Sequence, residues 1–474
     1  MSKTPEETAT ALMNGLYALV SKAAGDIEET TNDDPFIAWC KPGVPFEPED
    51  FRFARFMLTG QGATPEEKLS DMMAQVTQAA GFSRFVDFVP SVSGVVDQNI
   101  EGGVLRPGSA TLSTFYKRVL DSSQVAQLPE PAGVNERIAE LRAQAAPLRE
   151  AYEAEEQKYN EAKAAFVGAA LGAGMSAEKQ LEFQINGATL QANVTKAMQN
   201  WEIAGGKTEY ENLLAEIASL RSKRSPAIWR SEAIAEYEAV PQGQNAVFGE
   251  ARLTMPYPGT FATNQGGWMS FAMKTEDVDS LSQSKSTKWS AGGGVGWGSF
   301  KLGGSASGST TQNLTINDTS GFSLSLSIAQ IPLLRTWFDP WFLKSEFWRF
   351  NPNSIEGQNN DVVSDGMSPP NGLIVGYPVS AIFVRGVEIS MAELHDESSE
   401  LVKSLKGEAK GGWGLGALNL GGTYERNSSE KKHASTLVDG KLSVPGLQLI
   451  GFVCEAMPSS PKPKEGVTWI DGTD

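Results

Sequence analysis

The side chains that usually carry catalysis or bind metals are few in this sequence and do not stand at useful spacings. The chain has two histidines, His395 and His433, and two cysteines, Cys40 and Cys454. None of the four lies at a ligand spacing from another, so neither a zinc site nor a histidine-dependent catalytic triad is expected. Glycines between residues 292 and 298 resemble a dinucleotide loop only superficially, because no helical pattern follows them. We therefore expect no enzyme activity, no metal and no cofactor.

A different chemistry, contact with lipid or with another protein surface, is indicated by a glycine-rich repeat. Residues 293–304 (GGVGWGSFKLGG) align without gaps on residues 411–422 (GGWGLGALNLGG), at an offset of 118, and share six glycines and one leucine. A two-residue turn of type II′ needs glycine at its first central position. Gly298-Ser299 and Gly416-Ala417 satisfy this requirement, so each segment is predicted to form a β-hairpin.

The two turns fix which residues share a face of each hairpin, because side chains alternate along a strand. Apolar side chains gather on one face and polar side chains such as Lys301 and Asn419 on the other. The pairs predicted on the apolar face are Trp297 with Phe300, Val295 with Leu302, Leu415 with Leu418 and Trp413 with Leu420.

The apolar faces have two interpretations. They can pack inside a sandwich or barrel core, or they can insert into a bilayer as part of an oligomeric barrel, which leaves no unpaired strand edge. Arms of about ten residues are close to the 9 to 11 that a tilted membrane-spanning strand needs. The two states can follow one another. The residues expected to contact lipid or a neighbouring subunit are Trp289, Val295, Trp297, Phe300, Leu302, Trp413, Leu415, Leu418 and Leu420.

Over about residues 280–435 this pattern resembles the β-barrel pore-forming proteins as a broad class. The resemblance rests on long Ser/Thr/Gly-rich amphipathic hairpins without catalytic motifs. The tryptophan-rich undecapeptide of cholesterol-dependent cytolysins and the glycine-tyrosine motif of perforin-like proteins are both missing. The segments Pro378–Ile389 and Pro445–Cys454 also resemble bacterial and fungal proteins of no known function, a family that supplies no residue roles.

The charge of the chain limits its partners. With 40 basic and 57 acidic residues the net charge is −17, and no basic stripe with interleaved aromatics occurs, so nucleic acid is not an expected partner. The acidic N-terminus argues against a Sec signal, and no run of 18 uncharged apolar residues predicts a membrane-spanning helix. We expect a soluble protein made in the cytoplasm, which reaches a membrane only after release.

The first half of the chain is predicted to be helical. Thr4-Pro5 and Thr64-Pro65 mark helix starts, and the second of these helices is expected to end near Gly81. Residues 133 to about 224 show near-heptad spacing and predict long antiparallel helices with a kink at Pro147. The uncharged run Ala164–Met175 indicates a close-packed helical turn or, alternatively, an apolar tongue at the tip of a helical hairpin.

The second half is predicted to be β-rich, which makes the fold class α+β. Phe322, Leu324, Leu326 and Ile328 alternate with serines as in a half-buried strand, and further strands are expected at 373–375, 381–389 and 447–454. The aromatic side chains of segment 337–350 are expected in the core or, alternatively, at a bilayer boundary, and Asp339-Pro340 is expected to turn the chain between two aromatic strands. The last ten residues, with Trp469 and Ile470, are expected to fray or to dock on another subunit.

These patterns divide the chain into a helical region at 1–132, long antiparallel helices at 133–235, a β-rich domain at 236–457 with hairpins near 287–311 and 405–428, and a tail at 458–474. The expected function is that of a soluble, oligomerising, membrane-active protein that inserts its hairpins, with a homo-oligomer and a lipid membrane as partners. The alternative is a non-enzymatic structural or interaction module that self-assembles through the same hairpins.

Overall fold

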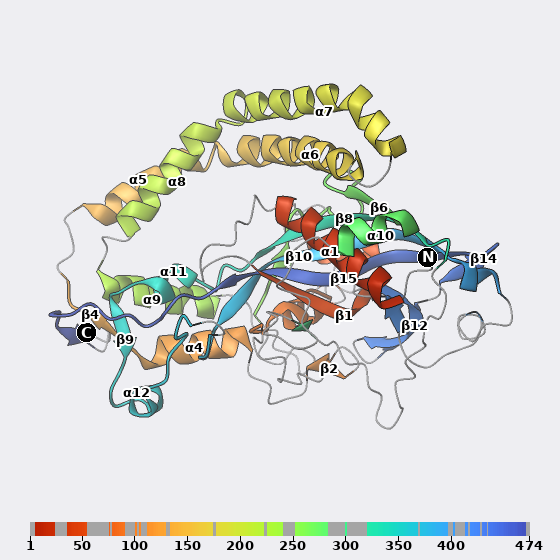
Figure 1. The fold of residues 1–474 in the computed structure, drawn as a ribbon. Helices are drawn as coiled ribbons and strands as arrows, with labels where there is room; N and C mark the ends of the chain where they lie inside the picture. Colours follow the sequence, from red (N-terminus) through yellow and green to blue (C-terminus); the bar gives the residue numbers. More distant parts are fainter. Residues whose placement is uncertain are drawn as a thin grey trace, which may run out of the picture.

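The fold is α+β, as expected, with helices concentrated in the first half of the chain and antiparallel strands in the second (Figure 1). The computed structural model describes residues 5–23, 36–54, 75, 78–90, 100–101, 104–105, 111–128, 133–173, 177–221, 225–239, 252–282, 299–300, 320–367, 370–396, 402, 413–415, 418–426, 429–433 and 435–470.

An eight-stranded sheet forms the centre of the molecule. Its hydrogen-bonded path is β5-β8-β10-β15-β1-β7, with β6 paired to β8 and β14 paired to β15. All pairs are antiparallel except β1 with β7. The strands are β1 (Phe36–Phe46), β5 (Met255–Pro256), β6 (Met269–Lys274), β7 (Ser299–Phe300), β8 (Ser323–Leu334), β10 (Gly376–Ser390), β14 (Thr436–Val438) and β15 (Lys441–Ala456).

Two of the strands predicted from apolar runs are confirmed, and one is wrong. Residues 381–389 lie inside β10 and residues 447–454 inside β15. Residues 373–375 precede β10 instead of forming a strand. Their amides, at Leu373 and Ile374, reach only the carbonyls of Val362 and Val363, and two such bonds do not extend into a ladder.

The two faces of the sheet bury different sets of side chains. In β8 the predicted alternation is confirmed, because Phe322, Leu324, Leu326 and Ile328 are all buried on one face. That face is covered by α1 (Pro5–Ala23) and the short helix α10 (Val278–Ser282). The other face is covered by a phenylalanine-rich layer, in which Phe51 meets Phe383 of β10 edge-on at 5.4 Å. Two cores therefore share one sheet.

The phenylalanine-rich layer comes mostly from the N-terminal region, with Phe261 added from the second half of the chain. It includes the short helix η1 (Pro48–Phe51) and a helix whose described part covers residues 78–86. That helix continues past Gly81, where the sequence predicted its end, because Phe82, Phe85 and Val86 complete its buried face. The region 1–132 also contains strands, of which β1 belongs to the main sheet and β2 (Ile100–Glu101) pairs with β3 (Val104–Leu105).

Four helices form an antiparallel arm that extends along one side of the sheet (Figure 1). The helical arm consists of α5 (Val134–Ala145), α6 (Arg149–Ala173), α7 (Ala177–Ile203) and α8 (Lys207–Arg221). The predicted break at Pro147 is confirmed, since α5 ends two residues before it and α6 begins two residues after it. Most of the uncharged run from 164 to 175 continues α6, which ends at Ala173, shortly before α7 begins at Ala177.

A third core, rich in aromatic side chains, lies at one end of the sheet (Figure 1). β14 lies at the other end. Trp337, Phe342 and Trp348 are buried, as expected for core residues. Asp339 does not turn the chain between two strands. Its carboxylate accepts a hydrogen bond from the Trp341 amide at 3.0 Å and begins a helix, which leaves Trp341 exposed. The elements here are α4 (Leu112–Ser122), β4 (Ser123–Ala126), α9 (Pro226–Ala239), α11 (Pro340–Lys344), β9 (Trp348–Phe350) and α12 (Ile355–Asn359).

The C-terminal tail docks on the same chain. Trp469 and Ile470 form β16 and pair with Ala126 and Val125 of β4. The guanidinium of Arg349 lies 4.9 Å from the centre of the Trp469 ring. The expectation that the tail frays or reaches another subunit is therefore wrong, because it finds both a strand edge and a cation within its own molecule.

Candidate functional site

The second predicted hairpin is present, with one change in its pairing. β11 (Trp413–Leu415) pairs antiparallel with β12 (Leu418–Arg426), and Leu415 lies opposite Leu418, as the proposed turn requires. Trp413 lies opposite Gly421 instead of Leu420. The register shifts between Trp413 and Gly414, so β12 carries an extra residue there, as in a β-bulge. The turn residues 416 and 417 lie outside the described part of the chain.

The leucines of this hairpin are buried within the chain's own core. Leu415 is 4% exposed, and Leu418 and Leu420 are 0% exposed. They belong to the same cluster as Trp39 of β1 and Ile450 of β15, and both strands contact β12. In this conformation the apolar face of the hairpin packs on the main sheet. Leu415→Asp would bury a carboxylate without a partner, so we expect this substitution to destabilise the folded chain.

Within the described part of the chain, the hairpin contacts the main sheet through side chains. β11, β12 and β13 (Ser429–His433) form a separate three-stranded sheet, and no backbone ladder joins it to the eight-stranded sheet among the described residues. Beneath it, the buried indole Nε1 of Trp39 has no hydrogen-bond partner in that part of the chain. An unsatisfied buried donor costs about 1–3 kcal/mol. The contact between the two sheets is thus apolar, and it covers an indole N–H of Trp39 that has no hydrogen-bond partner among the described residues.

Most of the first predicted hairpin, including Trp289, Val295, Trp297 and Leu302, lies outside the described residues. Its described part, Ser299 with Phe300, forms β7 and pairs in parallel with Trp39 and Cys40 of β1. β1 is also the strand on which the second hairpin packs. The structure thus brings parts of both repeat segments to one strand of the main sheet, which the sequence could not show.

The residues weighed for metal or thiol chemistry are not gathered into a site. Within the described ranges, no group of three or more His, Cys, Asp or Glu side chains is placed to hold a metal ion. Cys40 and Cys454 are both buried in the core, and burial raises the pKa of each thiol above its ordinary value. Such thiols are poor nucleophiles, because the reactive form is the thiolate.

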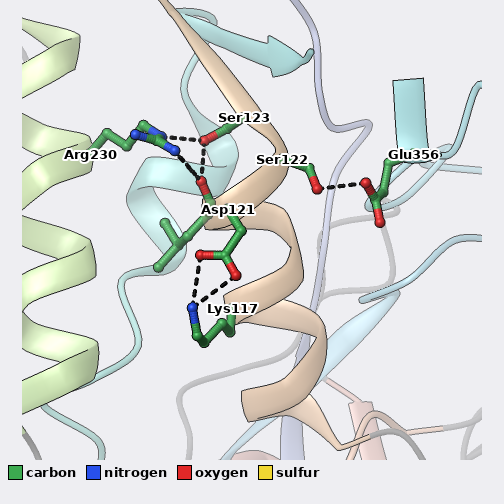
Figure 2. A network of polar contacts seen from close by, with 7 residues as sticks. Lys117, Asp121, Ser122, Ser123, Arg230 and Glu356 are labelled. Carbon is green, nitrogen blue, oxygen red and sulfur yellow. Dashed lines mark hydrogen bonds and ion pairs between the residues drawn. The ribbon is translucent and has the colours of Figure 1, made fainter. Parts of the chain in front are cut away.

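Sequence reasoning missed a polar network at the end of α4, shown in Figure 2. The buried Arg230 donates to the Leu120 carbonyl at 2.8 Å and to the Ser123 hydroxyl at 2.8 Å. Arg230 therefore caps the C-terminus of α4, where backbone carbonyls lack helical partners. The one sequence signal for it is that Arg230 is the single basic residue in the sequence of α9.

The neighbouring carboxylate of Glu356 lies between α12 and α4. Its oxygens accept hydrogen bonds from Arg118 and from Ser122. The bond from Ser122, at 2.5 Å, is drawn in Figure 2. Burial alone would raise the pKa of Glu356, but these hydrogen bonds and the nearby guanidinium outweigh burial and hold its pKa at about 2. Glu356 therefore remains ionised and ties two helices together.

A second buried cluster joins four segments. The Asp87 carboxylate accepts two hydrogen bonds from Ser113, from its amide at 2.8 Å and from its hydroxyl at 2.5 Å. Arg335 lies nearby and donates to the carbonyls of Val86 and Pro378. Burial raises the pKa of Asp87, while the Ser113 hydrogen bonds and Arg335 act against that rise. These bonds connect the 78–86 helix, α4, β8 and β10, which is a structural role.

A shallow depression of about 550 Å³ lies where α7 turns into α8. It is lined by acidic side chains, among them Glu202, Glu209 and Glu216, together with Ile203. Glu216 is already paired with Arg137 at 3.0 Å. The depression is open to solvent on the outside of the helical arm, so its carboxylates have no dry cavity in which to act as an acid–base pair.

The described helices include none that is both long enough and apolar enough to cross a membrane. The described residues instead offer an amphipathic hairpin stacked on a sheet, and structural polar clusters elsewhere. Comparison of the chain with family models, with curated proteins and with solved structures gave no match.

Proposed function

We propose that the protein is membrane-active, that it oligomerises, and that it acts by releasing the β11–β12 hairpin from the main sheet so that its leucines meet lipid. The observation that carries the proposal is the packing of this hairpin: its apolar face is buried, yet it belongs to a separate sheet. Among the described residues, release requires no backbone ladder to break between the two sheets.

The energetics favour release only where another apolar surface is available. Burying a leucine side chain contributes about 1.5–3 kcal/mol, so exposing Leu415, Leu418 and Leu420 to water costs roughly 5–9 kcal/mol. Transfer into a bilayer returns most of that free energy, because the acyl chains replace the sheet as cover. The hairpin therefore stays packed on the main sheet in water. At a membrane surface its leucines leave the sheet and contact acyl chains instead.

The length of β12 is compatible with this role. It has nine residues, Leu418–Arg426, within the 9 to 11 of a tilted membrane-spanning strand. Bilayer insertion of strands also requires closure into a barrel, because unpaired backbone groups are costly in hydrocarbon. The proposal therefore includes association of several copies at the membrane.

The second candidate function is self-assembly without lipid. β13 is the terminal strand of the small sheet, and its outer edge has no partner strand among the described residues. An open edge can pair with a strand of another chain. In that case the hairpin leucines remain buried, and β13 makes the contact between copies.

The decisive experiment compares two leucines of the same core. Leu418 in the hairpin and Leu16 in α1 are both fully buried in one cluster, so Leu418→Ala and Leu16→Ala should destabilise the protein similarly, by about 2–5 kcal/mol. Leakage of a trapped dye is then measured on vesicles of phosphatidylcholine, with and without phosphatidylglycerol. A chain of net charge −17 should favour the vesicles without the anionic lipid.

If the hairpin inserts, Leu418→Ala lowers leakage by about tenfold, because one lipid-contacting side chain is lost, whereas Leu16→Ala retains or increases it. Equal losses for both variants would contradict insertion, since leakage would then follow stability alone. Wild-type protein that leaves both kinds of vesicle sealed would also contradict it. Rings or filaments seen by electron microscopy without lipid would then support assembly through β13.

A further inference from the structure

Helix α7 carries two apolar stripes on opposite faces. The inner stripe faces α6 and includes Phe183, Gly187 four residues further on, and Trp201 fourteen residues, or two heptads, after that. The Phe183 ring lies 5.8 Å from Phe166 of α6, and the Trp201 ring stacks on Tyr159 at 5.3 Å. This stripe accounts for the pairing of α7 with α6.

The outer stripe has no such partner within the described chain. It consists of Leu181, Ile185, Ala188 and Ala192, at steps of four, three and four residues, and all four side chains are exposed. Leu181 is 59% and Ile185 67% exposed, unusual values for large apolar residues. α7 lies on the far side of α6 from the sheet, so this face points away from the rest of the molecule (Figure 1). Heptad spacing is the pattern by which a helix packs against a second helix.

The charge around the outer stripe matches a second copy of the chain. The whole chain has a net charge of −17, yet residues 183–195 of α7 contain no charged side chain. Two strongly acidic molecules repel each other over most of their surfaces, and the repulsion is least where neither surface carries charge. This face is therefore one along which two copies can approach.

The shape of the stripe is complementary to itself. If two α7 helices pack antiparallel about a two-fold axis between residues 186 and 187, Leu181 faces Ala192 of the second copy, and Ile185 faces its Ala188. Each large side chain then meets a small one, as interdigitated packing requires. Two-fold symmetry repeats each of these contacts.

We infer that the outer stripe of α7 is an antiparallel, two-fold interface between two copies of this chain. The inference does not depend on the proposed membrane function, because it concerns association in solution and involves no hairpin residue. The helical overlap from residue 177 to 196 is about 30 Å long. One helix–helix contact buries less than the about 800 Å² per partner of a standard interface, so the dimer is weak, with a Kd on the order of 100 μM.

The first test is sedimentation equilibrium of the full chain over a range of concentrations reaching several times that Kd. The average mass of the wild-type protein rises toward that of a dimer. Ile185→Glu places a carboxylate on the stripe and weakens association by about tenfold or more, because a charge is costly in an apolar contact. Asn193→Glu adds the same charge to an exposed position of α7 outside the stripe and leaves association nearly unchanged. Both variants should show the wild-type circular dichroism spectrum, since both positions are exposed.

The second test fixes the register. Ile185→Cys protein mixed with Ala188→Cys protein should form a mixed disulfide on mild oxidation, and the native Cys40 and Cys454 do not compete because they are buried. A wild-type chain that stays monomeric throughout, or equal effects of the two glutamate variants, overturns the inference. Preferential formation of an Ala192→Cys homodimer overturns the proposed register, because residue 192 would then lie on the two-fold axis.

Discussion

The hydroxyl of Tyr257 donates a 2.8 Å hydrogen bond to the carboxylate of Glu153. Tyr257 directly follows β5 of the main sheet, and Glu153 is in the second turn of α6, so this bond connects the sheet to the helical arm. Further along α6, the carboxylate of Glu161 lies against Gly266. A Cβ atom at position 266 would overlap this carboxylate. The Tyr257–Glu153 bond is thus a specific polar contact between the arm and the sheet, in addition to the packing of α6 against β6 and α1.

Tyr257→Phe should loosen this joint. It removes one hydrogen bond to a half-buried carboxylate, which we expect to cost about 1 kcal/mol. Hydrogen exchange followed by mass spectrometry should show faster exchange in α6, with the main-sheet strands unchanged. Tyr210→Phe is the matched control, since it removes a hydroxyl from within the arm rather than from the joint. Equal exchange in the two variants would show that the bond does not hold the arm.

Glu156, near Glu153 on α6, should make the protein less stable as the pH rises. Burial, followed by repulsion from Glu153 and Glu211, raises the pKa of Glu156 above its ordinary value of 4.5, although Lys207 acts against the rise. The folded state therefore binds the proton more tightly than the unfolded state, and this contribution is lost as the pH rises from about 4.5 through the raised pKa.

Glu156→Gln should consequently stabilise the protein at pH 7, by about 0.5 kcal/mol after allowance for solvent screening, and change little at pH 4. Urea denaturation at the two pH values measures this difference. Glu150→Gln, at an exposed position of the same helix, is the control. A variant that loses stability at pH 7 would show that Glu156 makes a favourable bond in its charged form.

Glu356 should act in the opposite sense. Its pKa is held at about 2, below the ordinary 4.5, so its contribution is fully present above pH 4.5 and is lost as the pH falls toward 2. Glu356→Gln should cost about 1–3 kcal/mol at pH 7, because Arg118 loses a charged partner, and much less near pH 2. Thermal unfolding across this range tests it. Asp121→Asn, in an exposed pair with Lys117, should cost less than about 1 kcal/mol at pH 7.

Trp469→Ala should show that the tail is part of the fold. The substitution removes the ring that packs on Arg349 and weakens the pairing of β16 with β4, at an expected cost of about 1–2 kcal/mol. The midpoint of thermal unfolding should fall accordingly. Glu465→Ala, at an exposed position of the same tail before the paired residues, is the control and should leave the midpoint nearly unchanged. A midpoint unaffected by Trp469→Ala would mean that β16 adds nothing to stability.

How far the sequence predicted this structure depended on how local each signal was. The alternation in β8, the break at Pro147 and the Leu415–Leu418 pair depend on neighbouring residues, and all three are confirmed. The role of β1 was not predicted, because its partner strand β15 lies at the other end of the chain. The role of Asp339 was misjudged because a helix cap and a turn favour the same residue types.

The candidate site was only partly accessible to sequence reasoning for a similar reason. Periodicity shows that Leu418 and Leu420 share a face, but not what covers that face, and the cover turned out to include Trp39 from the start of the chain. The bulge opposite Trp413 was also missed, because an extra residue in one strand leaves no clear mark in a glycine-rich sequence. Arg230 was missed because its partners are backbone carbonyls, which every sequence supplies.

The pairing of Phe36 with Cys454 has a consequence for biosynthesis. Roughly 400 residues separate these partners, and at a translation rate of about 5–20 residues per second the ribosome needs roughly 20–80 s to make the second after the first. Throughout that interval β1, with its apolar side chains on both faces, has no β15 to bind. The apolar side chains of β1 therefore lack their native partners until synthesis is almost complete. We expect chaperones to bind the nascent chain during this interval.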